Sequence, residues 1–266
     1  MRAILLVPVV VGSIACGGSA PRVVTPAPRA DAPYRAVHID TLAPDKVERF
    51  VAARAAWKGE LEKAGASDGR GVFLQVGDHA MYTVRSFAAF ADFDTRGDAI
   101  DRSLAKVPKA ASDAYDQGAD SSLVYPHTSE VWQVDPQLSY APASGALTEA
   151  TAAVGRLVLD DVRPDPASRD PYWDAIDEQN QALAAAHYPL TRIGFRTMFG
   201  AGHVITLWLA PSQQALDTAP SVEAAVASVR GAERAKQLAA TIAGAIVHHD
   251  EQPVVVRHDL TRLQGP

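Results

Sequence analysis

The chain has 266 residues, of which 47% are hydrophobic and 21% are charged. This composition excludes a disordered tail, a collagen and a coiled coil, and the length suits one large domain or two of about 130 residues. The 25 Lys and Arg residues against 31 Asp and Glu residues give a net charge of −6. Because the cations form no basic stripe, nucleic acid is not expected as a partner. The single cysteine excludes a disulfide framework and a cysteine-rich metal site.

The first 15 residues have the pattern of a secretory signal peptide. Arg2 supplies a positive charge, and the apolar run Ala3–Val11 is too short to span a bilayer, which takes about 20 residues. The sole cysteine, Cys16, follows directly. Its position resembles the lipobox of bacterial lipoproteins, in which this cysteine becomes the first mature residue and carries the lipid; Ser13 stands where that family usually has Leu. The alternative is ordinary cleavage nearby, with Cys16 incidental.

Residues 16–33 are rich in proline and predict an extended, flexible tether between a membrane and a folded domain. Gly17 occupies the position where an aspartate often retains lipoproteins in the inner membrane. The resemblance therefore implies a lipid-anchored protein of the bacterial cell envelope, attached to the outer membrane through Cys16.

Hydrophobic periodicity predicts the element order β-α-β-β-α-β over residues 34–140. The predicted strands are Arg35–Leu42, Val72–Val76, Ala80–Phe87 and Glu130–Val134, and the predicted helices run from Pro44 to Gly65 and from Asp98 to Gly118, the latter kinked by Pro108.

The same order returns over residues 154–266, and the triplet that starts at Ala43 has its counterpart 120 residues later, at Arg163. Residues 141–153 are predicted to link the two repeats. The predicted strands are Arg156–Val162, Arg192–Phe199, His203–Leu209 and Pro253–Leu260, and the predicted helices are Ser168–His187 and Ser221–Ile246.

This unit is the ferredoxin-like motif, whose antiparallel sheet has both helices on one face and leaves the other face bare. Two units in one chain can cover each other sheet to sheet. At this level the sequence resembles the dimeric α/β-barrel superfamily in a tandem, single-chain form. The resemblance implies an α+β fold and a monomer that acts as an internal pseudo-dimer. The rival is two separate ferredoxin-like domains without a joint barrel.

Neither a metal nor a cofactor is expected. The sequence lacks a P-loop, a G-x-G-x-x-G fingerprint, a G-x-S-x-G elbow and an H-E-x-x-H motif. His248, His249 and His258 form the densest group of metal-ligand types, but neighbouring side chains of an extended chain point to opposite faces. We therefore expect a polar turn from helix to strand rather than a chelate.

Strand alternation suggests a site. In the first strand, Val37 and Ile39 share one face and are expected to meet the helices, so His38 and Asp40 would face the barrel interior or its mouth. His38 is then a candidate for proton transfer, since histidine titrates near neutral pH, and Asp40 is a candidate to orient it.

The same alternation separates Arg192, Arg196 and Trp208 from their apolar neighbours, and Arg257 from Val256. Arginines in a concave space would suit an oxyanion, which makes these four residues candidate ligand contacts. The alternative is that they pair with protein groups or lie on a solvated edge.

Three functions follow from these patterns. The first is a lipid-anchored protein that binds a small ligand, with an anion favoured, without catalysis. The alternative, implied by the superfamily, is an enzyme of the mono-oxygenase, isomerase or lyase type, either cofactor-independent or haem-dependent. The third is a partner-binding module that uses the outer helix faces.

Overall fold

A computed structural model describes residues 33–261, except residue 70 and residues 200–202. The predicted signal peptide, Cys16 and nearly all of the predicted tether lie outside the described residues. Among the helices in the described ranges, none combines the length and the hydropathy that crossing a bilayer requires.

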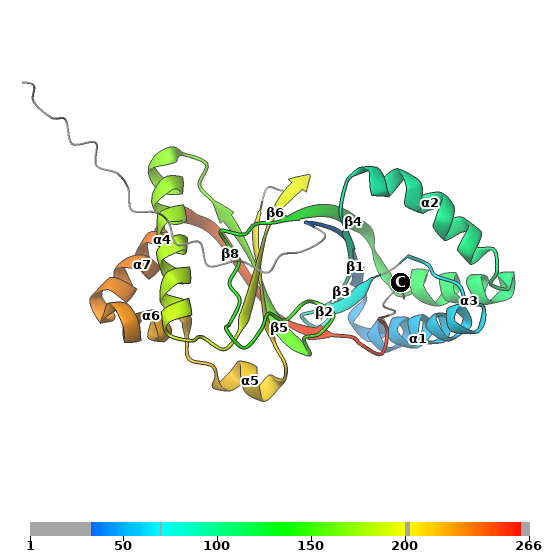
Figure 1. The fold of residues 1–266 in the computed structure, drawn as a ribbon. Coiled ribbons are helices and arrows are strands. Elements are labelled where there is room, and N and C mark those ends of the chain that lie inside the picture. Colours follow the sequence, from blue (N-terminus) through cyan, green and yellow to red (C-terminus); the bar gives the residue numbers. More distant parts are fainter. Residues whose placement is uncertain (1–32, 70, 200–202, 262–266) are drawn as a thin grey trace, which may run out of the picture.

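The first half of the folded chain alternates strands with helices in the predicted order (Figure 1). Its elements are β1 (Tyr34–Leu42), the 3-10 turn η1 (Pro44–Lys46), α1 (Val47–Lys63), β2 (Val72–Val76), β3 (Ala80–Phe87), α2 (Ala91–Leu104), α3 (Lys109–Asp120) and β4 (Leu123–Val134). The single helix predicted over 98–118 is two helices, because Pro108 is the N-cap of α3 and its extended backbone separates α3 from α2.

The second half follows the same order with an additional short helix. Its elements are β5 (Val154–Val162), α4 (Pro166–Ala185), β6 (Thr191–Phe199), β7 (Val204–Ala210), α5 (Gln213–Thr218), α6 (Val222–Arg230), α7 (Ala232–Ala245) and β8 (Ile246–Val256). The helix predicted over 221–246 is divided at Gly231, whose φ of 84° lies in the region that favours glycine.

The eight strands close into one antiparallel barrel in the order β1-β3-β2-β8-β5-β7-β6-β4. Each half contributes four adjacent strands, β4-β1-β3-β2 and β8-β5-β7-β6, so the strand order within the two halves is the same. The halves are joined at two seams, where β4 pairs with β6 and β2 pairs with β8. The rival arrangement of two separate domains is therefore wrong.

The barrel interior is a packed apolar core that draws on strands of both halves. Val37, Leu74, Trp132, Phe195 and Leu207 belong to this core. The predicted face assignment of the first strand is consequently inverted: Val37 and Ile39 point into the barrel, and His38 and Asp40 point outward. Alternation separates the two faces of a strand, but the closed interior, which excludes water from all sides, takes the apolar one.

The segment predicted as a linker also seals one end of the barrel. Ala152 is fully buried in the interior core, and Leu147 and Ala150 pack against it. Nearby, the Arg35 guanidinium donates to Glu149 over 2.8 Å, and both side chains are buried. The segment therefore joins the halves and also contributes to the core.

The helices cover the outside of the two half-sheets to different extents. In the first half α1 packs on α3, with Trp57 stacked on Tyr115 at 5.3 Å, while α2 lies apart from both helices in Figure 1. In the second half α4, α6 and α7 share a core that includes Ala182, Val226 and Leu238. The outer face of the first half-sheet is therefore less completely covered by its helices.

Candidate functional site

A cavity of about 420 Å³ opens on the outer face of the first half-sheet. Strands β1, β3 and β4 provide its floor, because residues that face each other across these strands point to the same side. It is lined by Ala36, Val37, His38, Thr83, Arg85, Ser129, Glu130, Val131 and Phe199.

His38 is held between two polar groups at this cavity. Its Nε2 lies 3.1 Å from Oδ1 of Asp40, which follows two residues later on the same strand face. Its Nδ1 lies 2.9 Å from Oγ of Ser129, the residue directly opposite on β4. Asp40 is only 4% exposed, whereas the imidazole is partly open to solvent. The two predicted catalytic candidates are thus in contact, although they lie outside the barrel rather than in it.

His127 completes this cluster, and the sequence analysis missed it. Its Nδ1 lies 3.7 Å from Oδ1 of Asp40, and its ring meets the His38 ring edge-on at 4.8 Å between centroids. The sequence predicted a strand only from Glu130 onward, because Pro126 is a residue that strands usually avoid. Residues 127–130 are all polar, so no alternation with apolar residues marked this part of the strand.

The remaining walls of the first cavity combine a buried hydroxyl with aromatic surface. Thr83 is 5% exposed, and its Oγ1 has no hydrogen-bond partner among the described residues. Phe199 is 65% exposed and lies edge-on to Phe90 at 6.2 Å. An exposed ring beside a cavity offers a stacking surface to a flat ligand.

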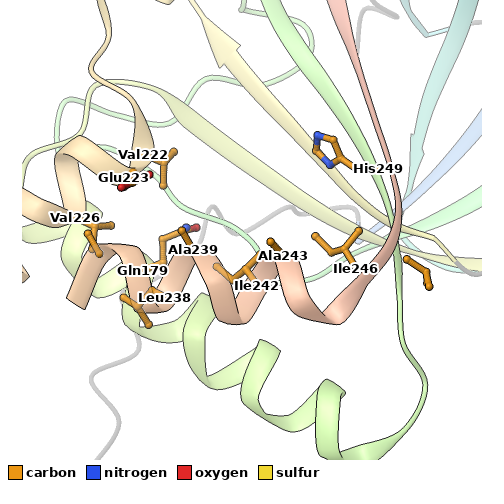
Figure 2. A pocket seen from close by; sticks show the side chains of 12 residues that line it. Gln179, Val222, Glu223, Val226, Leu238, Ala239, Ile242, Ala243, Ile246 and His249 are labelled. Carbon is orange, nitrogen blue, oxygen red and sulfur yellow. The ribbon is translucent and has the colours of Figure 1, made fainter. Parts of the chain in front are cut away.

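A second cavity, of about 510 Å³, lies on the outer face of the second half-sheet (Figure 2). Its lining is mostly aliphatic and comes from α4, α6, α7 and the start of β8. The lining residues are Gln179, Val222, Glu223, Val226, Ala235, Leu238, Ala239, Ile242, Ala243, Ile246, Val247 and His249.

At one end of the second cavity, Nδ1 of His249 lies 2.6 Å from Oδ1 of Asp160. Burial raises the pKa of Asp160, while the contact with His249 acts in the opposite direction. Asp160 follows Asp40 by 120 residues and His249 follows His127 by 122, so each half carries one cross-strand Asp–His contact on its outer face.

Two of the four predicted ligand contacts, Arg192 and Trp208, pack on each other outside the barrel at 5.0 Å. The Arg192 guanidinium is 4% exposed and donates to the side-chain amides of Gln179 and Asn180. Burial lowers the pKa of Arg192 to about 10.

The other two predicted contacts are engaged elsewhere. Arg196 pairs with Asp135 and lies over the Trp173 ring at 4.2 Å. Arg257 pairs with Asp259 at 2.7 Å and donates to Gln75. None of the four lines either cavity. The concave site predicted for these four residues is not found in the described part of the chain, because each guanidinium is engaged by protein groups of its own.

The predicted turn at His248 and His249 is also wrong, since both residues lie in β8, where their backbone pairs with β5. In a strand the neighbouring side chains of His248 and His249 point to opposite faces, as expected. His249 contacts Asp160, whereas Nε2 of His258 donates to the carbonyl oxygen of Ala152, 2.7 Å away. These three histidines do not converge on one point.

No protein-family model matches the chain, and no curated protein matches its sequence. Solved structures match its fold. A proposed monooxygenase from Fusobacterium nucleatum has a TM-score of 0.54 and 11% identity, with 85% of this chain and 92% of that chain covered. An anthrone oxidase-like protein has a TM-score of 0.50 and 11% identity, with 87% and 94% covered. A chlorite dismutase from Candidatus Nitrospira defluvii has a TM-score of 0.46 and 11% identity, with 87% and 95% covered.

These comparisons correct the first functional prediction. A binding protein without catalysis is contradicted, because the structures that share this fold are a proposed monooxygenase and an anthrone oxidase-like protein. They agree better with the alternative, an enzyme. At this level of identity the likeness establishes the fold alone: the chain is an α+β protein with the closed barrel of the dimeric α/β-barrel type.

Proposed function

We propose that this protein is a cofactor-independent enzyme of the oxygenase type, with its active site in the first cavity. The observation that carries the proposal is the position of His38, whose imidazole contacts a buried carboxylate and a hydroxyl while lining a cavity of about 420 Å³. A base, a group that orients it and a space for substrate are the parts that general base catalysis needs.

Asp40 would determine which nitrogen of His38 acts as the base. A carboxylate accepts a hydrogen bond from the ring nitrogen that carries the hydrogen. The contact of 3.1 Å between Oδ1 of Asp40 and Nε2 of His38 therefore favours the tautomer with the hydrogen on Nε2. Nδ1 then carries the lone pair. The Ser129 hydroxyl, 2.9 Å from Nδ1, lies beside the cavity and can donate to this lone pair or pass on a proton from a bound substrate.

The cavity walls suit a flat aromatic substrate with an acidic C–H bond. Phe199 exposes a ring for stacking, and Thr83 and Ser129 supply hydroxyl groups for an oxygen substituent. An anthrone has this chemistry, and one structure with the same fold is an anthrone oxidase-like protein. The volume lies within the range of about 300–1,000 Å³ that small-molecule sites occupy.

The proposed reaction begins when His38 removes a proton from the methylene carbon of the anthrone. The electron pair of that C–H bond is delocalised into the ring ketone and then reacts with O2. One oxygen atom remains as the new carbonyl of the quinone. The other leaves as water, together with the two hydrogens of the original methylene group.

The haem-dependent alternative does not fit the residues present. Haem iron needs an axial ligand such as an imidazole nitrogen. At His38 a porphyrin would have to displace either the buried Asp40 carboxylate from Nε2 or Ser129 from Nδ1. The second cavity is mostly apolar, and its lining includes the acidic residue Glu223 as well as His249. An acidic group there would repel the haem propionates. No step is therefore assigned to haem.

The proposal is tested by measuring O2 uptake by the purified chain with anthrone as substrate, together with the quinone absorbance. We expect His38→Ala to lower kcat by about 10²–10⁴-fold, the usual contribution of a positioned base. His249→Ala is the matched control, since it removes the histidine of the other Asp–His contact, and it should retain wild-type turnover.

Two outcomes would overturn the proposal. One is an absence of O2 uptake by the wild-type chain with anthrone at saturating concentration. The other is a His38→Ala variant that turns over at the wild-type rate, which would place the chemistry elsewhere.

We also propose that the two halves are tandem ferredoxin-like repeats within one monomer. This is supported by their common strand order and by the spacing of 120 residues between corresponding positions. The lipid anchor at Cys16 and attachment to the bacterial outer membrane stay proposals from the sequence. Mass spectrometry of the mature N-terminus would detect the lipid.

A further inference from the structure

We infer that His38, Asp40 and His127 form a binding site for one divalent transition-metal ion, such as Zn²⁺. The ligand atoms that these three side chains offer all lie within 4.8 Å of one another. Two imidazoles and one carboxylate are a donor set that borderline divalent metals favour, with further positions left for water. No metal was expected from the sequence, because His127 was not predicted to lie beside His38 and Asp40.

The spacing of the ligand atoms suits a metal ion. Bonds of about 2.0–2.2 Å to nitrogen and oxygen place neighbouring ligands roughly 3–3.5 Å apart around one ion. The observed separations from Oδ1 of Asp40 are 3.1 Å to Nε2 of His38 and 3.7 Å to Nδ1 of His127. Small side-chain rotations would therefore complete the coordination, since both imidazoles are partly exposed.

Ser129 provides a hydrogen-bond partner for the second ring nitrogen of His38. When Nε2 of His38 binds a metal, its proton must sit on Nδ1, and Ser129 Oγ lies 2.9 Å from Nδ1 to accept it. Such contacts orient metal-bound imidazoles in proteins. The buried hydroxyl of Thr83, which has no partner in the described part of the chain, lines the adjoining cavity and could bond to a metal-bound water.

The other Asp–His contacts do not offer this set. His249 meets Asp160, and His203 meets Asp161 at 2.5 Å, each with a single imidazole. Within the described residues, only His38, Asp40 and His127, beside the first cavity, bring three such groups together. A metal would also compensate the charge of Asp40, a buried carboxylate.

One consequence of the metal site rests on the proposed function of His38 as a base. A metal on Nε2 forces the His38 proton onto Nδ1, and this nitrogen can then no longer accept a proton from substrate. Metal binding and base catalysis by His38 are therefore alternatives. Added metal should inhibit the proposed reaction.

Binding is tested without reference to activity. Titration calorimetry of the full chain with Zn²⁺ should show one saturable site, and Co²⁺ in its place should give visible absorption bands of a nitrogen-ligated ion. We expect His127→Ala to abolish the saturable site, and Ser129→Ala to weaken Zn²⁺ binding by about 10–100-fold. His249→Ala is the matched control and should bind as the wild type does.

Because His127 is exposed, its replacement should leave the fold intact, which circular dichroism can verify. The inference is overturned if the wild-type chain shows no saturable Zn²⁺ binding, or if His127→Ala binds with unchanged affinity. In the activity arm, Zn²⁺ should suppress O2 uptake at the concentration that saturates the calorimetric site. Undiminished uptake at that concentration would overturn the competition between metal and base, whereas wild-type inactivity without metal would count against the proposed function alone.

Discussion

The two halves of the barrel carry the same contact in different surroundings. Asp40 and His127 in the first half correspond to Asp160 and His249 in the second, on the outer face of each half-sheet. In the first half this pair gains a second imidazole and a hydroxyl, and it lies by a cavity lined with polar and aromatic groups. In the second half it lies at the end of an aliphatic cavity.

The packing of the helices accounts for this difference. In the second half α4, α6 and α7 pack together over the sheet, and the space left beneath them is enclosed by Val226, Leu238 and Ile242. In the first half α1 and α3 pack together while α2 lies apart (Figure 1). The His38 imidazole on that outer face therefore stays partly open to solvent, whereas Asp40 beside it is buried. The same strand order thus carries a cavity with polar and aromatic groups in one half and a mostly aliphatic cavity in the other.

The largest predicted difference between the two halves concerns the replacement of each aspartate by asparagine. Asp40→Asn should lower kcat for anthrone oxidation by about 10²–10⁴-fold, because an amide does not select the tautomer in which Nδ1 is the base. Asp160→Asn should leave kcat unchanged. Steady-state O2 uptake by the two variants measures both effects, and equal losses in the two variants would mean that the halves are functionally equivalent.

A second prediction uses the aliphatic character of the second cavity. Ala239→Leu adds apolar volume inside it and should raise the free energy of unfolding by about 0.5–2 kcal/mol, the usual gain from filling a cavity. Urea denaturation monitored by tryptophan fluorescence measures this change. A stabilised variant with unchanged turnover would support a packing role for the second half, whereas lost turnover would place the active site there.

The smallest predicted effect is a pH dependence at Asp160. Burial raises its pKa above the ordinary value of 3.8, with Asp161 and Glu251 acting in the same direction and His249 in the opposite one. The folded state therefore holds this proton more tightly than the unfolded state does. The contribution of Asp160 to stability is present below the unfolded pKa and is lost as the pH rises through the folded pKa.

Asp160→Asn lacks this titration. The free energy of unfolding of Asp160→Asn minus that of the wild type, measured by urea denaturation, should therefore be larger at pH 7 than at pH 4. A difference between the two chains that does not change with pH would contradict the raised pKa.

Much of the fold follows from hydrophobic patterns. The strands Val72–Val76 and Ala80–Phe87 are found at their predicted bounds, and the order of elements in both halves is confirmed. The errors lie where apolar periodicity is absent. The polar start of β8, from Val247 to Gln252, has no alternating apolar residues, and its backbone is held as a strand by pairing with β5.

The candidate site was only half predictable. His38 and Asp40 share a strand face by alternation, and they are in contact. His127 could not be assigned, because the strand that carries it contains Pro126 and is paired irregularly with β1 near Asp40. The arginines were misassigned for a different reason, since each is engaged by a protein group. The partners of Arg192 and Arg196, Gln179 and Asp135, lie outside the strand that carries them. Arg257 instead pairs with Asp259, two residues later.

The amino-acid sequence by itself determined the period of each strand and the order of strands and helices, since a strand of period two separates its polar from its apolar side chains wherever it lies. Only the tertiary structure decided which of those sides is inward. Closure of eight strands creates one volume without access to water, and this volume takes the apolar sides of both half-sheets. The polar sides, with the histidines and Asp40, are thereby left outside the barrel, where the helices determine how much water reaches them.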